Sequence, residues 1–327
     1  MSASGPIIVT GPDRSGTTLL YALLGSHPAV SMVRRTNLWR WFDGRYGDLA
    51  ITANLDRCLD AMLDYRRLQV LEPDRERLRA AFLQGEPTYG RLFDLLHRQH
   101  AERRGRRRWA DKSLHTEYAA NRVFAEVPDA RIIHMVRDPR DRYASIIRRY
   151  DGPGKGVGAA MGRWVASLRA GHRNLARHPD RYLFVRYETL ASTPEPTLQR
   201  ICAFLGEDYD AGMLRMGIVA GDDAWDGNSS FGGFAPGTIS TRPIGRYRST
   251  LTPRQIAFIQ TCAGRLMRAH DYVAEPLQLT ARERATFYLA DLPVGQARLL
   301  GWMATRRFSD WRDGGVPDHR LTSAAAS

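Results

Sequence analysis

The chain has 327 residues, and its hydrophobic content of 43% with 9% aromatics supports a large core and argues against wholesale disorder. Its formal net charge of +13 is dispersed and reflects an arginine-rich composition with only two lysines, so we predict no nucleic-acid partner. No run of 18 apolar residues occurs, no signal peptide precedes the first predicted strand, and the three scattered cysteines indicate reduced thiols. We therefore expect a cytoplasmic protein without a transmembrane helix.

The first predicted elements surround a glycine-bearing turn. Residues 6–10 predict a strand, residues 19–24 predict the first turns of a helix, and a G-x-x-x-x-G pattern spans 11–16. A helix start after such a turn presents backbone N–H groups at the positive end of the helix dipole, which suits a phosphate, although such a turn can also serve geometry alone. Thr17 stands where a nucleoside triphosphate-binding loop has its lysine. The cation must therefore come from Arg14, and we expect a ligand other than a triphosphate.

A long helical segment follows. Apolar residues recur at helical spacing within 49–106, with a helix restarting after 73–74, and we predict that this segment is an insertion between the first two strands of the sheet. A basic cluster at 103–108 leads into a second predicted strand at 107–111. Either a solvated turn or a docking patch for an acidic molecule would account for this cluster.

A second candidate anion site lies at the end of a third predicted strand, at 131–136. Arg137 follows this strand directly, and Ser145 and Arg149 share one face of the next predicted helix at i, i+4. Because an arginine can grip an anionic group in bidentate fashion, the cluster predicts recognition of a second anion at the sheet edge. The alternative is an ordinary salt-bridged helix start made by Asp138, Arg140 and Asp141.

The remaining elements complete an alternating pattern. A fourth strand is predicted at 182–187, a helix at 195–205, and a mobile glycine-rich loop at 220–243. Alternation of strands and helices predicts an α/β fold with a mainly parallel central sheet flanked by helices in three layers.

The C-terminal extension at 277–327 is predicted to be helical, with a disordered end at 322–327. Within it, residues 294–308 are basic and amphipathic. Such a helix can lie on an anionic membrane, pack on its own domain, or contact a second copy in a homodimer.

Taken together, the two anion-site segments resemble the sulfotransferase family that uses 3′-phosphoadenylyl sulfate (PAPS). The resemblance is closest to the branch of tyrosylprotein and bacterial sulfotransferases, in which an R-S-G-T-T loop precedes a His-Pro pair; here these are residues 14–18 and 27–28. It implies a P-loop-like domain over 1–276 and a bacterial enzyme that moves a sulfuryl group to a hydroxyl of a small molecule, glycan or lipid. It also implies PAPS as co-substrate, PAP as product, no metal, and an acceptor pocket shaped by the helical insertion.

The resemblance also implies roles for individual residues. Arg14 and Lys112 would stabilise the charge of the transferring sulfuryl group, the first loop would hold the 5′-phosphosulfate, and Arg137 with Ser145 would hold the 3′-phosphate. Tyr187 matches a position near the adenine, or is an aromatic at the end of a buried strand, and Arg246 matches a late basic loop over the phosphates. The predicted cofactor-binding residues are Asp13, Arg14, Ser15, Gly16, Thr17, Thr18, Arg137, Ser145, Arg149, Tyr187 and Arg246.

One position departs from the family pattern. Members of this branch have a glutamate general base about 21 residues after the loop arginine, and here that count ends at Arg35. An arginine cannot accept a proton from a hydroxyl at physiological pH. His115 or Asp43 could be the base instead, since a histidine near its ordinary pKa is suited to this role. Alternatively, Arg34 and Arg35 bind an acidic acceptor.

Two alternative functions remain open at this point. The chain could be a PAPS- or PAP-binding protein that has lost catalysis, which Arg35 would explain. A P-loop kinase is the third interpretation, but Thr17 in place of the loop lysine and the Arg137…Ser145 pair argue against it.

Overall fold

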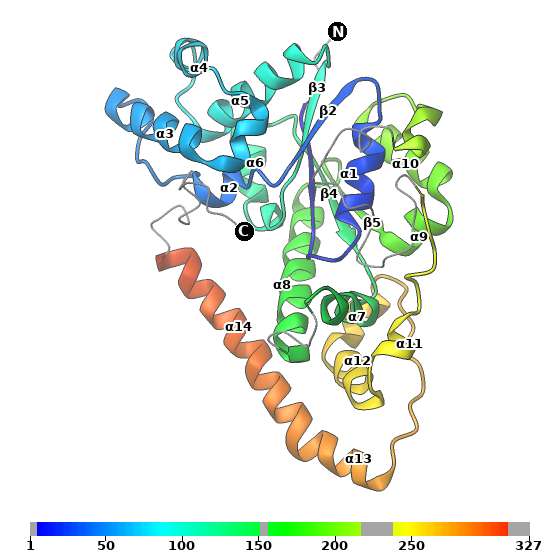
Figure 1. Cartoon of the computed structure of the whole chain (residues 1–327). Coiled ribbons are helices and arrows are strands. Elements are labelled where there is room, and N and C mark those ends of the chain that lie inside the picture. Colours follow the sequence, from blue (N-terminus) through cyan, green and yellow to red (C-terminus); the bar gives the residue numbers. More distant parts are fainter. Residues whose placement is uncertain (1–4, 151–155, 217–237, 313–327) are drawn as a thin grey trace, which may run out of the picture.

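The computed structural model describes residues 5–150, 156–216 and 238–312 (Figure 1). The predicted disordered end at 322–327 and most of the predicted mobile loop at 220–243 lie outside these residues.

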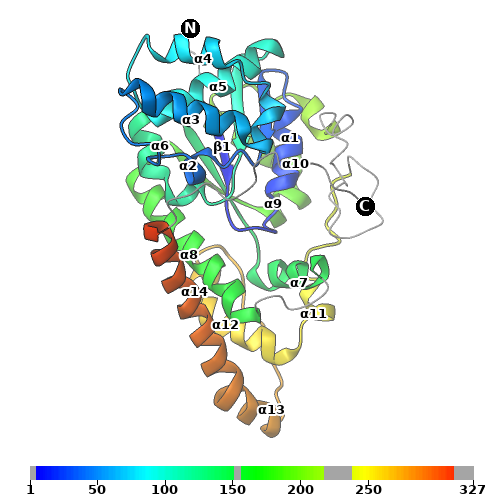
Figure 2. The same cartoon turned by 60° about the vertical axis from the view of Figure 1, so that its left-hand side comes forward.

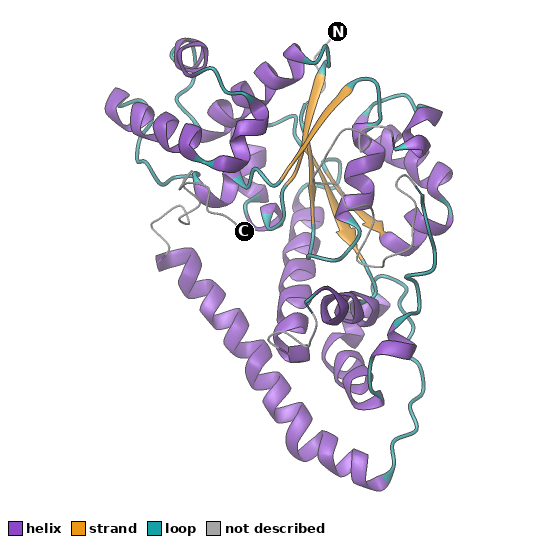
Figure 3. Cartoon of the chain, in the orientation of Figure 1, coloured by secondary structure: helices purple, strands orange, loops and turns teal. Residues whose placement is uncertain are grey.

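A five-stranded parallel sheet forms the centre of the molecule (Figure 3). The strand order is β2-β3-β1-β4-β5, and every neighbouring pair is parallel. Because all strands run the same way, their carboxyl ends meet at one edge of the sheet. The strands are β1 (Ile7–Thr10), β2 (Val30–Arg34), β3 (Arg108–Lys112), β4 (Arg131–Val136) and β5 (Tyr182–Arg186).

Helices cover both faces of this sheet, which confirms the predicted three-layer α/β fold (Figure 3). The α-helices are α1 (Thr17–Gly25), α2 (Leu38–Trp41), α3 (Thr52–Asp64), α4 (Arg75–Phe82), α5 (Tyr89–Arg103), α6 (Ala120–Glu126), α7 (Pro139–Arg149), α8 (Gly156–Arg177), α9 (Tyr187–Ser192), α10 (Pro194–Leu205), α11 (Tyr247–Thr250), α12 (Pro253–Arg268), α13 (Ala281–Thr286) and α14 (Leu292–Arg312). Shorter turns are the 3₁₀ helices η1 (Arg66–Leu71), η2 (Thr116–Tyr118) and η3 (Ala211–Arg215) and the π-helical turn η5 (Phe287–Asp291). Among the described residues, no helix is long and apolar enough to cross a membrane.

The sequence analysis missed one strand, β2. Its sequence, VSMVR, is short, and Ser31 and Arg34 interrupt the apolar pattern that would have indicated a buried strand. In the structure β2 pairs in parallel with β3, from Val30 with Arg108 to Arg34 with Lys112. The helical insertion therefore lies between β2 and β3, and the prediction that it separates the first two strands is corrected.

The insertion itself is helical, as predicted. Helices α3, α4 and α5 enclose a core of their own, shared with Leu38 and Phe42 at α2. Asp74 caps the start of α4 by accepting a hydrogen bond from the backbone N–H of Arg77, at 3.0 Å, which accounts for the helix start expected after 73–74. Figure 1 shows this unit beside the β2–β3 side of the sheet.

The C-terminal extension packs on its own chain. Helix α14 runs along α8, and the two views in Figures 1 and 2 agree on this placement. A Cβ added to Gly158 of α8 would lie 2.1 Å from the carbonyl oxygen of Gly295, and one added to Gly162 would lie 3.1 Å from that of Leu299. Small residues on α8 therefore allow the two helix backbones to approach closely.

Candidate functional site

The turn between β1 and α1 is held in a conformation that only certain residues can adopt. Gly11 has φ 125°, and a Cβ there would lie 2.4 Å from the carbonyl oxygen of Met135. Gly16, the N-cap of α1, has φ 90°, and its Cβ would lie 2.4 Å from the ring of Tyr187. The two glycines of the G-x-x-x-x-G pattern are therefore both required by the backbone and by close neighbours.

Backbone strain gathers at the carboxyl edge of the sheet. Four non-glycine residues with positive φ lie just after β1, β2 or β3: Arg14 (65°), Arg35 (63°), Asn37 (52°) and His115 (76°). Among the described residues only three others have such values. Left-handed backbone at a non-glycine residue is costly and is concentrated at functional sites, so this edge is the candidate site.

Asp13 anchors the loop to the protein below it. Its backbone carbonyl accepts a hydrogen bond from Arg142 Nε at 2.8 Å, and its carboxylate forms an ion pair with the same guanidinium, which is buried. Burial favours the neutral carboxyl, but Arg142 outweighs it and holds the pKa of Asp13 below its ordinary value. Arg142 also donates to the carbonyl of Ala160 at 2.9 Å, and so links the loop to α8.

The remaining loop residues present donors. The Ser15 hydroxyl is buried and has no hydrogen-bond partner among the described residues. Thr17 and Thr18 open helix α1, and Thr18 Oγ1 lies 3.4 Å from Lys112 Nζ. A buried hydroxyl without a partner costs free energy unless a ligand satisfies it.

The two predicted anion sites converge. Arg14 Nε donates to Ser145 Oγ at 3.0 Å across 131 residues of sequence, and Arg137 Nη1 donates to the Arg14 carbonyl at 3.3 Å. Arg137 is buried, with its guanidinium 4.4 Å from the centroid of the Tyr187 ring and its Nε unpartnered within the described ranges. Burial lowers the pKa of Arg14, and Arg137 lowers it further, which shows how strongly cationic this edge is.

The late basic loop also lies against this cluster. The Asp141 carboxylate accepts backbone hydrogen bonds from Gly245 at 2.7 Å and Tyr247 at 2.9 Å, which fixes Arg246 between them at the start of α11. Burial, followed by the charges of Arg148 and Arg137, lowers the pKa of Arg246. Asp141 therefore positions the loop.

The structure also places Tyr187, Arg149 and the Asp138–Arg140 pair, which the sequence analysis had named. Tyr187 is the first residue of α9, buried between Gly16 and Arg137, and Arg149 lies exposed in the last turn of α7. The salt-bridged helix start is also present, because Asp138 caps α7 and its carboxylate pairs with Arg140 at 2.6 Å. That pair coexists with the convergence of the two anion sites.

Lys112 ends β3 as a buried cation. It is 3% exposed, its Nζ lies 3.4 Å from Thr18 Oγ1, and the Tyr21 ring centroid lies 5.8 Å from Nζ. Burial lowers the pKa of Lys112 to about 7, with further lowering by Arg35 and Arg34. A nearby anion would therefore stabilise the charged ammonium form of Lys112.

Arg35 lies beside this lysine. Its backbone N–H donates to the Lys112 carbonyl at 2.8 Å. The turn is fixed by Asp111, whose carboxylate accepts hydrogen bonds from the hydroxyls of Thr36 and, at 2.5 Å, Ser113. The position of the family glutamate is thus adjacent to the candidate catalytic lysine, and arginine occupies it.

The two candidate bases differ in their surroundings. His115 is half-buried just after β3, and its charge contributes to the lowered pKa of Asp13, so it lies near the phosphate loop. Asp43 forms an ion pair with Arg122 of α6 at 2.9 Å. Burial raises the pKa of Asp43 to about 6, but the ion pair holds its carboxylate toward α6. Of the two candidate bases, His115 is therefore the one that lies near Asp13 and the loop at 11–16.

A buried polar network beneath the loop was not anticipated from sequence. Glu117 is 1% exposed and accepts hydrogen bonds from Thr10 Oγ1 at 2.5 Å and Ser167 Oγ at 2.6 Å. Ser167 also contacts His134 Nε2 at 3.2 Å, and burial lowers the pKa of His134 to about 4, so its ring is neutral. Because Thr10 immediately precedes the loop, this network supports it from below. Only its proximity to the Lys112 motif could have drawn attention to Glu117.

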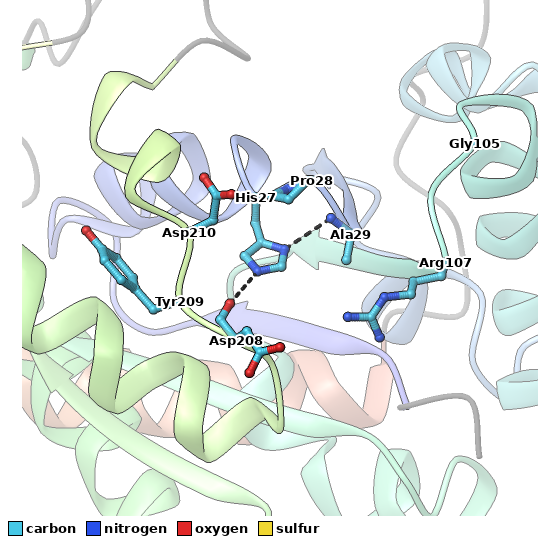
Figure 4. Close-up of a pocket in the computed structure, with 8 residues that line it drawn as sticks. All are labelled: His27, Pro28, Ala29, Gly105, Arg107, Asp208, Tyr209 and Asp210. Atoms are coloured by element: carbon cyan, nitrogen blue, oxygen red, sulfur yellow. Dashed lines mark hydrogen bonds between the residues drawn. The ribbon is translucent and has the colours of Figure 1, made fainter. Parts of the chain in front are cut away.

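A separate cavity of about 430 Å³ lies at the opposite, amino-terminal edge of the sheet (Figure 4). There His27 Nε2 donates to the Asp208 carbonyl at 2.9 Å, while His27 Nδ1 accepts from the backbone N–H of Ala29 at 3.1 Å (Figure 4). Both ring nitrogens are satisfied, so His27 is a structural residue that joins two loops. Within the described ranges, no group of three or more His, Cys, Asp or Glu side chains could hold a metal ion.

One solved structure, with a TM-score above 0.5, shares this fold. The sulfotransferase domain of the Synechococcus PCC 7002 olefin synthase is 22% identical, with a TM-score of 0.54 over 84% of this chain and 98% of that chain. Sulfotransferase STF9 from Mycobacterium avium is 18% identical, with a TM-score of 0.46 over 84% and 79%. Mouse sulfotransferase SULT7A1, solved in complex with PAP, is 14% identical, with a TM-score of 0.46 over 83% and 87%.

Sequence comparison gives the family. No curated protein sequence matches the chain. A family model described as "Sulfotransferase family" matches residues 6–211, which include all five strands of the described sheet, the glycine-bearing turn at 11–16 and the Arg137 segment. The chain therefore belongs to the sulfotransferase family.

Proposed function

We propose that the donor in the sulfuryl transfer supported by family membership is PAPS, and that the acceptor is a hydroxyl group. The observation that carries the proposal is the hydrogen bond from Arg14 to Ser145, with Arg137 bound to the Arg14 carbonyl. The turn that carries Arg14 and the segment that carries Arg137 and Ser145 therefore lie in contact, and each is suited to bind one phosphate-like group. A ligand with two separate anionic groups on one nucleoside matches this arrangement.

The charge balance supports an anionic ligand. Among the described residues, no carboxylate lies within ion-pair distance of Arg14, Arg137 or Lys112, although all three are largely buried. Buried cations are normally paired, because removing a charge from water is costly. Together with the unpartnered hydroxyl of Ser15, these groups form a site whose neutralisation is left to a ligand.

Each residue has a proposed part in binding. The backbone N–H groups of 14–18 and the Arg14 guanidinium would hold the 5′-phosphosulfate at the start of α1. Arg137 and Ser145 would hold the 3′-phosphate, with Arg149 and Arg246 adding positive charge at the rim. Tyr187 would support Gly16 and Arg137 from below and offer its edge to the adenine, and Asp13 would position the loop through Arg142.

In the reaction, PAPS supplies the sulfuryl group: the acceptor oxygen bonds to sulfur as the S–O bond to the 5′-phosphate breaks, and PAP leaves with the electron pair. Lys112 and Arg14 would stabilise the negative charge that develops on the leaving oxygen and on the sulfuryl oxygens. The acceptor hydroxyl must lose its proton, and we assign that role to His115 because of its position beside the loop.

Arg35 favours a second candidate function, PAP or PAPS binding without transfer. It lies next to Lys112 where the family glutamate would be, and it adds a positive charge in place of a base. If His115 does not act as the base, the site can bind the nucleotide without activating an acceptor hydroxyl.

Titration calorimetry of the full chain with PAP, ADP and ATP in metal-free buffer tests the donor. We expect PAP to bind at least about tenfold more tightly than ADP, because only PAP has a 3′-phosphate for Arg137 and Ser145. Preference for ATP would contradict the proposal and favour a kinase.

A turnover assay then separates transfer from binding. Radiolabelled PAPS is incubated with a panel of hydroxyl acceptors and wild-type, His115→Gln and Arg35→Glu proteins. Transfer by the wild type that His115→Gln abolishes, with PAP affinity unchanged, would support the assigned base. Selective PAP binding with transfer only in Arg35→Glu would support the binding-only function.

A further inference from the structure

Exposed apolar side chains of the described residues are concentrated on one helical element. The described residues expose nine large hydrophobic side chains, and four of these lie within 13 residues of the continuous helix made by α13, η5 and α14. These are Tyr288 at 60%, Leu289 at 82%, Val294 at 50% and Leu300 at 63%. Single exposed apolar residues are ordinary, but such a concentration marks an interaction surface.

The inner face of this helix is already covered. Phe287 is buried against α12, and Gly295 and Leu299 lie on Gly158 and Gly162 of α8 at backbone contact distance. Figure 2 shows α14 lying along α8 at the margin of the molecule. The apolar residues that dock the extension on its own domain are therefore distinct from the exposed ones.

The outer face is apolar as well. Its exposed residues Leu289, Pro293, Ala297, Leu300 and Ala304 are spaced by four, four, three and four positions, which places them along one side of a helix. They form a stripe about 22 Å long at 1.5 Å per residue. A helix that is apolar on both faces is expected to be covered on both, and here only the inner face is.

We propose that this outer face, defined by Leu289, Pro293, Ala297, Leu300 and Ala304, docks the protein on the surface of a bilayer that contains anionic lipids. Charge complementarity selects this occupant. Arg282 and Arg284 are exposed in α13, directly before the stripe, whereas the Arg298 guanidinium lies against Gly156 of α8. The neighbouring acidic groups are engaged, since Asp291 pairs with Arg254 at 2.7 Å and the Glu283 carboxylate accepts hydrogen bonds from the backbone N–H and the hydroxyl of Thr280.

The same charges disfavour a second copy of the chain as the occupant. Symmetric pairing of two outer faces would bring together two chains that each carry a net charge of +13. A bilayer surface accepts an apolar stripe in its interface while anionic head groups neutralise flanking arginines. Tyr288, at the start of the stripe, is of the type enriched at this interface.

Vesicle co-flotation of the full chain tests the proposal. We expect binding to vesicles of phosphatidylcholine with 30% phosphatidylserine, about fivefold weaker binding for each of Arg282→Ala and Arg284→Ala, and little binding to pure phosphatidylcholine. The double variant Leu289→Glu/Leu300→Glu should reduce binding at least about tenfold, because two apolar side chains no longer enter the interface. Val70→Glu/Leu83→Glu, at two exposed apolar residues of the insertion, is the matched control and should bind as the wild type does.

Folding is checked by circular dichroism and thermal unfolding. If the glutamate variant does not fold, Leu289→Ala/Leu300→Ala is used, and its binding should still fall several-fold. Equal binding by outer-face and control variants would overturn the proposal. It would also be overturned if the protein ignores vesicles but forms a dimer that the outer-face variants dissociate, which would assign this face to a second copy.

Discussion

Each edge of the sheet buries an arginine, but only the arginine at the amino-terminal edge has a carboxylate partner among the described residues. At the amino-terminal edge, Arg108 is 2% exposed, pairs with Glu207 at 3.0 Å and donates to the Gly5 carbonyl at 2.6 Å. At the carboxyl edge, Arg137 is 4% exposed, donates to backbone carbonyls and has no carboxylate partner among the described residues. A buried cation neutralised within the chain holds a fold together, whereas one left without an anion prepares a site for an anionic ligand.

The backbone repeats this contrast. At the carboxyl edge, Arg14, Arg35 and His115 are held at positive φ. At the amino-terminal edge the turn before β3 uses Gly105, with φ 62°, which adopts that conformation without strain. At the carboxyl edge, strained backbone and buried cations without an ion-pair partner among the described residues therefore occur together.

The largest expected effect is on stability, at the amino-terminal edge. Arg108→Ala removes the buried partner of Glu207 and should lower the free energy of unfolding by about 3 kcal/mol, the lower end of the range for a broken buried ion pair, because Arg107 also contacts Glu207. Urea denaturation followed by fluorescence measures this change. An effect below about 1 kcal/mol would mean that this pair is not the structural element described above.

Arg137→Ala should weaken ligand binding rather than lower the free energy of unfolding. We expect PAP affinity to weaken by about 1.5–3 kcal/mol, the value of hydrogen bonds to charged groups, with little loss of folding stability. Calorimetric titration with PAP measures the first quantity and urea denaturation the second. Arg200→Ala, an exposed arginine on α10, is the control and should leave both unchanged. Unchanged PAP affinity in Arg137→Ala would refute the assignment of the 3′-phosphate site.

The sequence was informative where function depends on local spacing. The turn at 11–16 and the separation of Arg137 from Ser145 are encoded within single segments, so both segments could be selected as candidate anion sites before the structure showed that they meet. The positions of the helices in the insertion followed from apolar periodicity for the same reason.

Features that depend on contacts between distant segments could not be predicted. Arg108 was included in a cluster interpreted as a solvated turn, which describes the exposed arginines before it but is wrong for Arg108, since its partner Glu207 is 99 residues away. The burial of Glu117 and Asp141 could not be predicted from the sequence either. Their carboxylates are buried because hydroxyl or N–H groups of other elements donate hydrogen bonds to them. Strand β2 was missed because its burial comes from pairing with β3 rather than from an uninterrupted apolar run.

A pH dependence of PAP binding should arise at Lys112. Its pKa in the free protein is about 7, and a bound anion favours the charged ammonium, so the pKa rises when PAP binds. Binding therefore takes up a proton above pH 7, and affinity should fall by up to about tenfold per pH unit between pH 7 and the pKa of the complex. Titrations at pH 6.5, 7.5 and 8.5 measure this slope.

Lys112→Arg is the matched variant for this experiment. Arginine stays protonated throughout this pH range, so the variant should bind PAP with an affinity that hardly changes. A wild-type slope that persists in Lys112→Arg would assign the proton to another group.

The smallest effect concerns His27, which belongs to the predicted His-Pro pair yet lies at the edge opposite the candidate site. His27→Ala removes one hydrogen bond to the Asp208 carbonyl and one from the Ala29 N–H, and should lower the free energy of unfolding by about 1 kcal/mol. PAP affinity should not change, because no contact of His27 reaches the phosphate loop. If His27→Ala instead weakened PAP binding as much as Arg137→Ala, the two edges would be coupled through α1, and the division between a structural edge and a binding edge would fail.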